Sequence, residues 1–138
     1  MLSQTAEYAL RAALQLAQQS DGEPVQAAEL AARLRIPANY LAKTLHGLAR
    51  ARVLTSARGK GGGFRLARPA GRITLAEVIE PFDTLEGPRL CLLGRPECSD
   101  QNPCVAHWRW QAARQDAVRF YRATSLADML RPEASARG

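Results

Sequence analysis

The sequence has no apolar run near the length that crosses a bilayer, which takes about 18 consecutive residues. Its first residues, MLSQTAEYALRAALQL, have no basic stretch before the apolar part and no small-residue cleavage site, so they do not resemble a secretory signal. It also has no internal repeat. These absences predict a soluble cytoplasmic protein with no membrane partner, and 138 residues are enough for one hydrophobic core.

Negative charge is scarce relative to positive charge. The chain has 13 Asp and Glu against 19 Lys and Arg, a net charge of +6, and arginine supplies most of the surplus. A basic excess on a small domain favours a polyanionic partner such as DNA. The alternative is a solubilising surface charge, or a general bias of the composition toward Arg and Ala.

Cysteine is scarce too, and its three copies lie close together in one polar loop. Cys91, Cys98 and Cys104 have the spacing C-x6-C-x5-C, and His107 follows. Three cysteines cannot all pair within one chain, so in a reducing cytoplasm they favour metal binding or catalysis over a disulfide framework. Thiolates select zinc, copper(I) or iron–sulfur clusters, and the spacing with His107 is also close to that of structural zinc sites.

Three alternatives to a metal site stay open for this loop. A thiol oxidoreductase would use Cys98 or Cys104 with His107, although one catalytic cysteine needs no two others beside it. A metal-free thiol switch would form a reversible disulfide, and the cysteines could also be unliganded. The sequence shows no set of nucleophile, base and orienting residue, so we predict no enzymatic activity.

The first half of the chain predicts a helix-turn-helix. Residues 3–19 favour a helix with apolar positions on more than one side, buried on two faces. A second helix should end at Ile36, because a residue before proline avoids the helical region, and Pro37 suits the start of a third. The apolar stripes that define these two helices are Ala27, Leu30, Ala31 and Leu34, then Leu41, Leu45 and Leu48.

The segment VLTSARGKGGGFRLARP predicts a hairpin with a flexible basic tip. Its β-prone pieces lie near residues 53–56 and 64–66, and a hairpin directly after a helix-turn-helix is the wing of a winged helix. The tip lacks the Gly-Lys-Ser/Thr ending of a nucleotide-binding loop, which excludes that function. Thr74 and Glu77 then form the capping box of another helix that ends near Pro81.

A helix-turn-helix places the first residues of its second helix in the major groove of DNA. An asparagine there can bind adenine through two hydrogen bonds. For Tyr40 the alternative is packing against Leu41 and its neighbours. Basic wing residues suit phosphates or a narrow groove. The candidate DNA-binding residues are Ala38, Asn39, Tyr40 and Lys43 in the helix and Arg58, Lys60 and Arg65 in the wing.

The last third of the chain predicts a long helix. Its apolar positions alternate in steps of four and three, the seam with which a helix lies along a partner helix. The seam suits a homodimer or packing against the helix at residues 3–19, and the two are compatible. Ser125 and Asp128 predict the cap of a short last helix. The seam consists of Ala106, Trp110, Ala113, Ala117, Phe120 and Thr124.

With the stretches ANYLAKTLHGLARA and ARGKGGGFRLARP, and with the cysteine loop before a long helix, the sequence resembles the iron–sulfur cluster-binding branch of the Rrf2 family of bacterial winged-helix regulators. The resemblance covers nearly the whole chain. It implies a homodimer on double-stranded operator DNA and a [2Fe–2S] or [4Fe–4S] cluster on Cys91, Cys98 and Cys104. The fourth ligand is then His107, which is local and which we favour, or Glu7 of the partner subunit.

We therefore expect a mainly α fold with a small β-hairpin wing. Residues 1–85 form the winged helix-turn-helix, 86–104 the cysteine cluster-binding loop, 105–131 the dimerisation helix with a short C-terminal helix, and 132–138 a disordered tail. The implied function is a DNA-binding transcriptional regulator, a repressor, that senses iron–sulfur status, redox state or nitric oxide through the cluster. The alternative is a zinc-stabilised or cluster-free winged-helix regulator without redox sensing.

Overall fold

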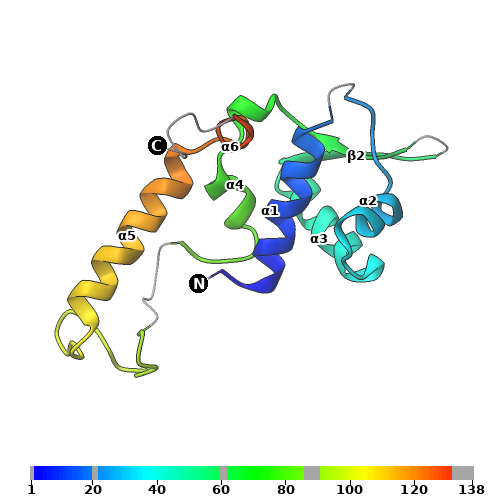
Figure 1. Ribbon diagram of the computed structural model, residues 1–138. Helices are drawn as coiled ribbons and strands as arrows, with labels where there is room; N and C mark the ends of the chain where they lie inside the picture. The colour runs from blue at the N-terminus through cyan, green and yellow to red at the C-terminus, as the bar shows by residue number, and fades with distance from the viewer. Residues whose placement is uncertain (1, 20–21, 60–61, 86–90, 132–138) are drawn as a thin grey trace.

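The computed structural model describes residues 2–19, 22–59, 62–85 and 91–131 (Figure 1). This part of the chain confirms the mainly α fold with a two-stranded hairpin. The expected tail at 132–138 lies outside the described residues. The elements are α1 (Gln4–Ala17), α2 (Ala27–Leu34), α3 (Ala38–Arg50), β1 (Leu54–Ala57), β2 (Gly63–Leu66), the 3-10 turn η1 (Ala70–Arg72), α4 (Leu75–Ile79), α5 (His107–Ala123) and α6 (Leu126–Leu130).

The central helix α1 is buried on more than one side, as expected. Ser3 caps its start, because the Ser3 hydroxyl accepts a hydrogen bond from the Ala6 N–H at 3.1 Å. The helix packs against α2, α3 and β2 on one side and against α4 and α6 on another (Figure 1). Small side chains allow this close approach, and the fully buried ones are Ala6, Ala9, Ala12 and Ala13.

The helix-turn-helix forms where the proline break predicts it. Helix α2 ends at Leu34, its C-cap Arg35 has a left-handed backbone with a φ of 57°, and α3 begins directly after Pro37. The α2 end is closed by the Ile36 N–H, which donates to the Ala31 carbonyl at 3.0 Å. The predicted core stripe of α3 is fully buried: Leu41, Leu45 and Leu48.

The wing is an antiparallel hairpin that is also tied to the body. Its register runs from Leu54 opposite Leu66 to Ala57 opposite Gly63. Beyond the hairpin, the N–H of Val25 donates to the Phe64 carbonyl at 2.9 Å and the N–H of Phe64 donates back at 2.8 Å. The wing is therefore fastened to the segment just before α2, a contact that the sequence pattern does not indicate.

Helices α4 and α6 start side by side. Both predicted capping boxes form, Thr74 with Glu77 and Ser125 with Asp128. The two caps are bridged by backbone hydrogen bonds of 2.9 Å, from the Leu75 N–H to the Thr124 carbonyl and from the Leu126 N–H to the Ile73 carbonyl. The chain that continues from α4 therefore returns, just before α6, to a place beside the start of α4.

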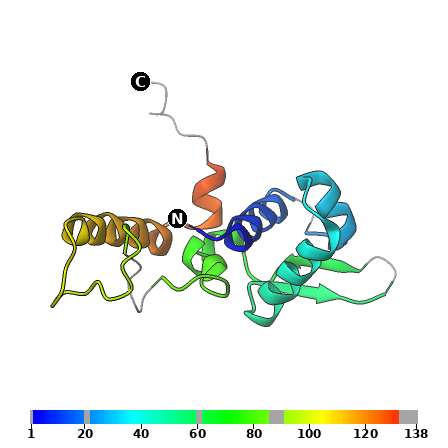
Figure 2. The same cartoon turned by 90° about the horizontal axis from the view of Figure 1, so that it is seen from below.

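Helix α5 projects from the rest of the molecule (Figures 1 and 2). Its main neighbour is α4 rather than α1, the helix considered as an internal partner from the sequence. His107 is the one buried residue of α5, while Trp108 and Phe120 are 56% and 49% exposed. Most of the helix surface is thus open in the single chain. Among the described residues, no helix has both the length and the apolar character to cross a membrane.

Candidate metal centre and DNA-binding surface

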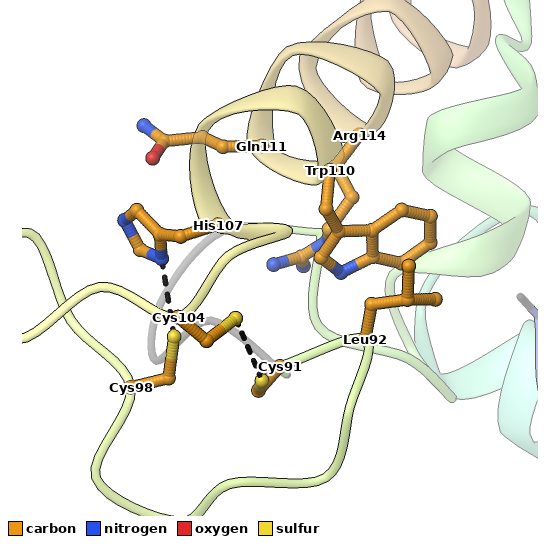
Figure 3. A pocket seen from close by; sticks show the side chains of 8 residues that line it. All are labelled: Cys91, Leu92, Cys98, Cys104, His107, Trp110, Gln111 and Arg114. Atoms are coloured by element: carbon orange, nitrogen blue, oxygen red, sulfur yellow. Dashed lines mark hydrogen bonds between the residues drawn. The ribbon is translucent and has the colours of Figure 1, made fainter.

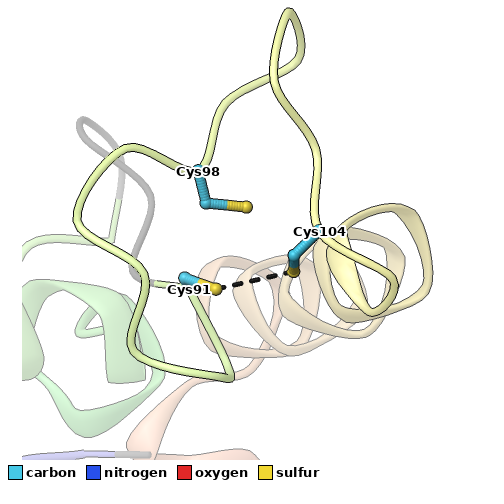
Figure 4. A group of neighbouring side chains, drawn as sticks. All are labelled: Cys91, Cys98 and Cys104. Carbon is cyan, nitrogen blue, oxygen red and sulfur yellow. Dashed lines mark hydrogen bonds between the residues drawn. The ribbon is translucent and has the colours of Figure 1, made fainter.

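The cysteine loop is folded by a series of tight turns. The Gly94 N–H donates to the Cys91 carbonyl at 3.1 Å, and Gly94 has a φ of 79°, which a glycine adopts without strain. Farther on, Ser99 and Asn102 exchange backbone hydrogen bonds of 3.3 and 3.1 Å. These turns direct the three cysteine side chains toward one another (Figure 4).

The three predicted thiol ligands converge. Their Sγ atoms all lie within 4.8 Å of one another, and the Sγ atoms of Cys91 and Cys104 are 3.5 Å apart. The Leu93 N–H donates to the Cys91 sulfur at 3.3 Å, as backbone N–H groups do at thiolate sites. A half-buried set of three soft sulfur donors suits a thiophilic metal ion or cluster.

The thiols differ in acidity. A hydrogen bond from the Arg95 backbone is the main cause that lowers the pKa of Cys91 to about 7. Hydrogen bonds from the Leu93 N–H and from the other two cysteines lower this pKa further, while burial raises it in part. A hydrogen bond from the Cys104 backbone lowers the pKa of Cys98, but burial and the neighbouring thiols outweigh it, so the pKa of Cys98 is raised. The Cys91 thiol is therefore more readily converted to thiolate, the form that binds metal, than the Cys98 thiol.

His107 lies beside the sulfur cluster but touches only one of its members. Its Nδ1 is 3.3 Å from the Cys98 Sγ (Figure 3). Its Nε2 is 2.8 Å from Oδ1 of Asp100. The ring is 5% exposed and packs edge-on against Trp108, with ring centres 4.7 Å apart. The structure thus places this predicted ligand next to the thiols and adds Asp100, which the sequence analysis did not identify.

A small cavity separates the sulfur atoms from α5. Its free volume is about 10 Å³, close to that of one water-sized sphere. Arg114 lines it and extends its guanidinium toward the sulfur side of the helix (Figure 3). Gln111 lines it as well, and its Oε1 is buried without a hydrogen-bond partner in the described part of the chain. The remaining lining residues are Cys91, Leu92, Cys98, Cys104, His107 and Trp110.

Glu7, the alternative fourth ligand, is not part of this cluster in its own chain. It is exposed in the first turn of α1. Arg11, its possible ion-pair partner, donates instead to the Leu34 carbonyl at 2.6 Å and lies 5.8 Å from the centre of the Tyr8 ring. Any contact of Glu7 with the thiols therefore requires a second subunit.

The start of α3 presents its predicted DNA-binding residues at the surface: Ala38, Asn39, Tyr40 and Lys43 are all exposed. Tyr40 also has internal partners, since its hydroxyl is hydrogen-bonded to that of Thr5 at 2.5 Å and its ring packs edge-on against Tyr8 at 5.3 Å. These partners on α1 replace the Leu41 packing considered from the sequence, and they hold the ring at the rim of the recognition surface.

The wing presents Arg58 and Arg65 to solvent, while Lys60 lies outside the described residues. In Figure 1 the wing and the cysteine loop lie at opposite ends of the molecule. An effect of the cysteine loop on the wing of the same chain therefore has to pass through the helices between them.

A helix-turn-helix followed by a hairpin wing defines a winged-helix DNA-binding protein, and the comparisons with known proteins agree. The profile of the Rrf2 family, described as iron-dependent transcriptional regulators, matches residues 2–132. The chain belongs to this family, so it is a DNA-binding transcriptional regulator and not an enzyme.

Relatives and solved structures resemble the chain over nearly its whole length. It is 34% identical to an HTH-type transcriptional regulator of Aquifex aeolicus over 135 residues, 96% of this chain and 93% of the relative. It is 32% identical to the regulator IscR of Xenorhabdus nematophila over 130 residues, 94% and 79% of the two chains. Solved structures share the fold as well, and two of them serve as examples.

The first of these structures is IscR of T. potens, with a TM-score of 0.73 and 24% identity over 94% of this chain and 85% of that one. The second is CymR (YrzC), the global cysteine regulator of B. subtilis, with a TM-score of 0.75 and 23% identity over 94% and 95% of the two chains. At these identities the likeness concerns the fold alone.

Proposed function

We propose that this regulator is a repressor whose DNA binding depends on an iron–sulfur cluster held by Cys91, Cys98 and Cys104. The observation that carries the proposal is the convergence of all three Sγ atoms within 4.8 Å. His107 is the proposed fourth ligand, because its Nδ1 already faces the sulfur atoms, and Glu7 of the partner subunit is the alternative. The description of the family as iron-dependent supports iron as the metal.

Each residue of the site has a distinct part in holding the group. Cys91, with its lowered pKa, supplies a thiolate near neutral pH. The Leu93 N–H stabilises the negative charge on that sulfur. Arg114 places a positive charge at the edge of the same cavity, which offsets the charge of several thiolates. When bound, an iron–sulfur cluster would supply a centre that changes state with redox conditions or nitric oxide.

The loop is coupled to DNA through α5. The His107 N–H donates to the Cys104 carbonyl at 3.1 Å, so the last cysteine of the loop and the first turn of α5 move together. Helix α5 packs on α4, and α4 packs on α1, which supports the recognition helix α3. A change in ligand positions therefore reaches the DNA-binding elements through packed helices.

We further propose that α5 forms the homodimer. Along its 17 residues only His107 is buried, and Trp108 and Phe120 are largely exposed. A second copy that covers this face would bury them and set the distance between two recognition helices. Half-sites one helical turn apart, about 34 Å, would then be read as a pair.

We propose a separate function for each of three segments of the chain. Residues 1–85 bind double-stranded DNA, 86–104 bind the cluster, and 105–131 form the dimer. In the helix-turn-helix, Asn39 and Lys43 contact bases or phosphates beside Ala38 and Tyr40. In the wing, Arg58, Lys60 and Arg65 contact the DNA backbone or a narrow groove.

A structural zinc ion is the second candidate for the same site. Two thiolates on one tetrahedral zinc ion, each at about 2.3 Å, lie roughly 3.8 Å apart. The 3.5 Å between the Cys91 and Cys104 sulfurs and the small cavity are close to this geometry. In that case the loop would stabilise the fold and α5 without any redox response.

Anaerobic purification distinguishes the two candidates. We expect a coloured protein that contains iron and sulfide and has an absorption band at roughly 400 nm. Its affinity for operator DNA should change when the cluster is removed. Replacing Cys91, Cys98 or Cys104 singly by Ser should abolish the colour, while Glu97→Gln, an exposed change in the same loop, should keep it. A colourless wild type with one zinc per chain would support the second candidate, and full iron in all three cysteine variants would exclude ligation by the loop.

A further inference from the structure

We propose that Asp100 is a positioning residue that fixes the tautomer of His107, so that Nδ1 presents a free lone pair to the cysteine sulfurs. The inference about the tautomer concerns the protein without metal. Its consequence for metal binding rests on the proposed function of the cysteine loop. Nothing in the spacing of the cysteines points to Asp100, because its contact with His107 arises only from the folded loop.

The hydrogen bonds determine where the proton of His107 lies. Asp100 Oδ1 is 2.8 Å from Nε2, and an ionised carboxylate can only accept a hydrogen bond. Nε2 must therefore carry the hydrogen. A neutral imidazole carries one such hydrogen, so Nδ1 is left as an acceptor, 3.3 Å from the Cys98 Sγ. In the metal-free protein Nδ1 accepts from the Cys98 thiol, and once that proton leaves, its lone pair is available to a metal.

The surroundings hold the ring in this orientation. His107 is 5% exposed, and its backbone N–H is bound to the Cys104 carbonyl. The Trp108 ring packs against one side of it. Asp100 is held by the turn that Ser99 and Asn102 close with paired backbone hydrogen bonds. A ring flip that exchanged the two nitrogens would break the bonds to Asp100 and Cys98 together.

Carboxylate partners of this kind act on metal sites through the histidine. They fix the ring orientation and make the facing nitrogen a better donor, and their loss typically weakens metal binding about 10–100-fold. Asp100 itself is 43% exposed in its side chain and does not belong to the group of thiols that converge. We therefore assign it a role through His107, and no direct contact with the metal.

The test compares Asp100→Ala with Glu97→Ala, which removes the same charge from an exposed position of the same loop. The reduced, metal-free protein is labelled with ¹⁵N-histidine and studied by long-range ¹H–¹⁵N NMR at a pH at which the ¹⁵N shifts show a neutral His107 ring. His46, the other histidine of the chain, serves as an internal reference. The wild type and Glu97→Ala should show His107 with hydrogen on Nε2 alone, and Asp100→Ala a mixture of both tautomers.

Cobalt(II) titration provides the second readout, through the sulfur-to-cobalt absorption band. We expect Asp100→Ala to bind cobalt about 10–100-fold more weakly than Glu97→Ala, and Asp100→Glu to recover most of the loss. If Asp100→Ala does not fold, Asp100→Asn keeps the shape of the side chain with a weaker acceptor, and it should raise the fraction of the Nδ1–H tautomer.

The two readouts separate the possible failures. An unchanged tautomer in folded Asp100→Ala or Asp100→Asn would overturn the assignment. A changed tautomer with unchanged cobalt affinity would overturn the metal-binding consequence. If the wild type bound no cobalt at all, the proposed function would fail, whereas the NMR result would still decide the role of Asp100.

Discussion

The substitution Gly63→Ala tests how the wing is held. Gly63 has a φ of 141°, and a Cβ placed on it would lie 2.4 Å from the Val25 carbonyl oxygen and 2.8 Å from the Gln26 nitrogen. Both neighbours are backbone atoms, so no side chain can move aside to make room. The segment before α2 has to shift away from the wing.

The expected cost combines two effects. The shift breaks the pair of hydrogen bonds between Val25 and Phe64, which contribute about 1 kcal/mol each to stability. An alanine in this backbone region, which is almost restricted to glycine, adds about 1–3 kcal/mol of strain. The free energy of unfolding should fall by about 3–5 kcal/mol, a large part of the roughly 5–15 kcal/mol typical of a domain.

Urea denaturation followed by circular dichroism measures this loss, with Gly71→Ala as the matched control. A Cβ on Gly71 meets only the Ala127 Cβ at 3.9 Å, an ordinary contact, so this variant should be as stable as the wild type or slightly more stable. Equal urea midpoints for Gly63→Ala and Gly71→Ala would refute the tight contact between wing and Val25.

Three further predictions concern DNA, thiols and assembly. Arg65→Ala should weaken operator binding and reduce the slope of log K against log salt by about 0.9, whereas Arg119→Ala on α5 should leave the slope unchanged. In metal-free protein, mass spectrometry should show that iodoacetamide modifies Cys91 before Cys98. The rate of Cys91 modification should fall as the pH drops below the Cys91 pKa of about 7, because the thiolate is then protonated. Phe120→Glu should halve the mass measured by light scattering, while Arg119→Ala should not; equal masses would place the dimer contact elsewhere.

Features that depend on near neighbours in the chain could be predicted from the sequence. The capping pairs at Thr74 and Ser125 and the leucine stripe of α3 are set by spacings of three and four residues, and the structure confirms all of them. The hairpin strands also lie within a residue or two of the expected ones. Helix periodicity and turn composition are local properties, so they are visible without the fold.

Contacts between distant segments could not be predicted in the same way. Val25 stands alone as a bridge partner of Phe64, so no alternation marks it as part of a sheet. The seam of α5 was visible, but its internal partner α4 depends on the path of the intervening loop. Asp100 lies in a polar turn without periodicity, and only the turn at Ser99 brings it to His107.

The hydrogen bonds between the caps of α4 and α6 have a consequence for how the protein can change over time. They join the start of α4 to the start of α6, so the chain between Leu75 and Thr124 begins and ends at neighbouring positions. Within that stretch Asp83 accepts a hydrogen bond from the Ser3 N–H at 2.8 Å, so its first residues still belong to the core. The cysteine loop farther along can be exchanged while α3 and the wing keep their own hydrogen bonds, so a new signal can be acquired without a new DNA-binding surface.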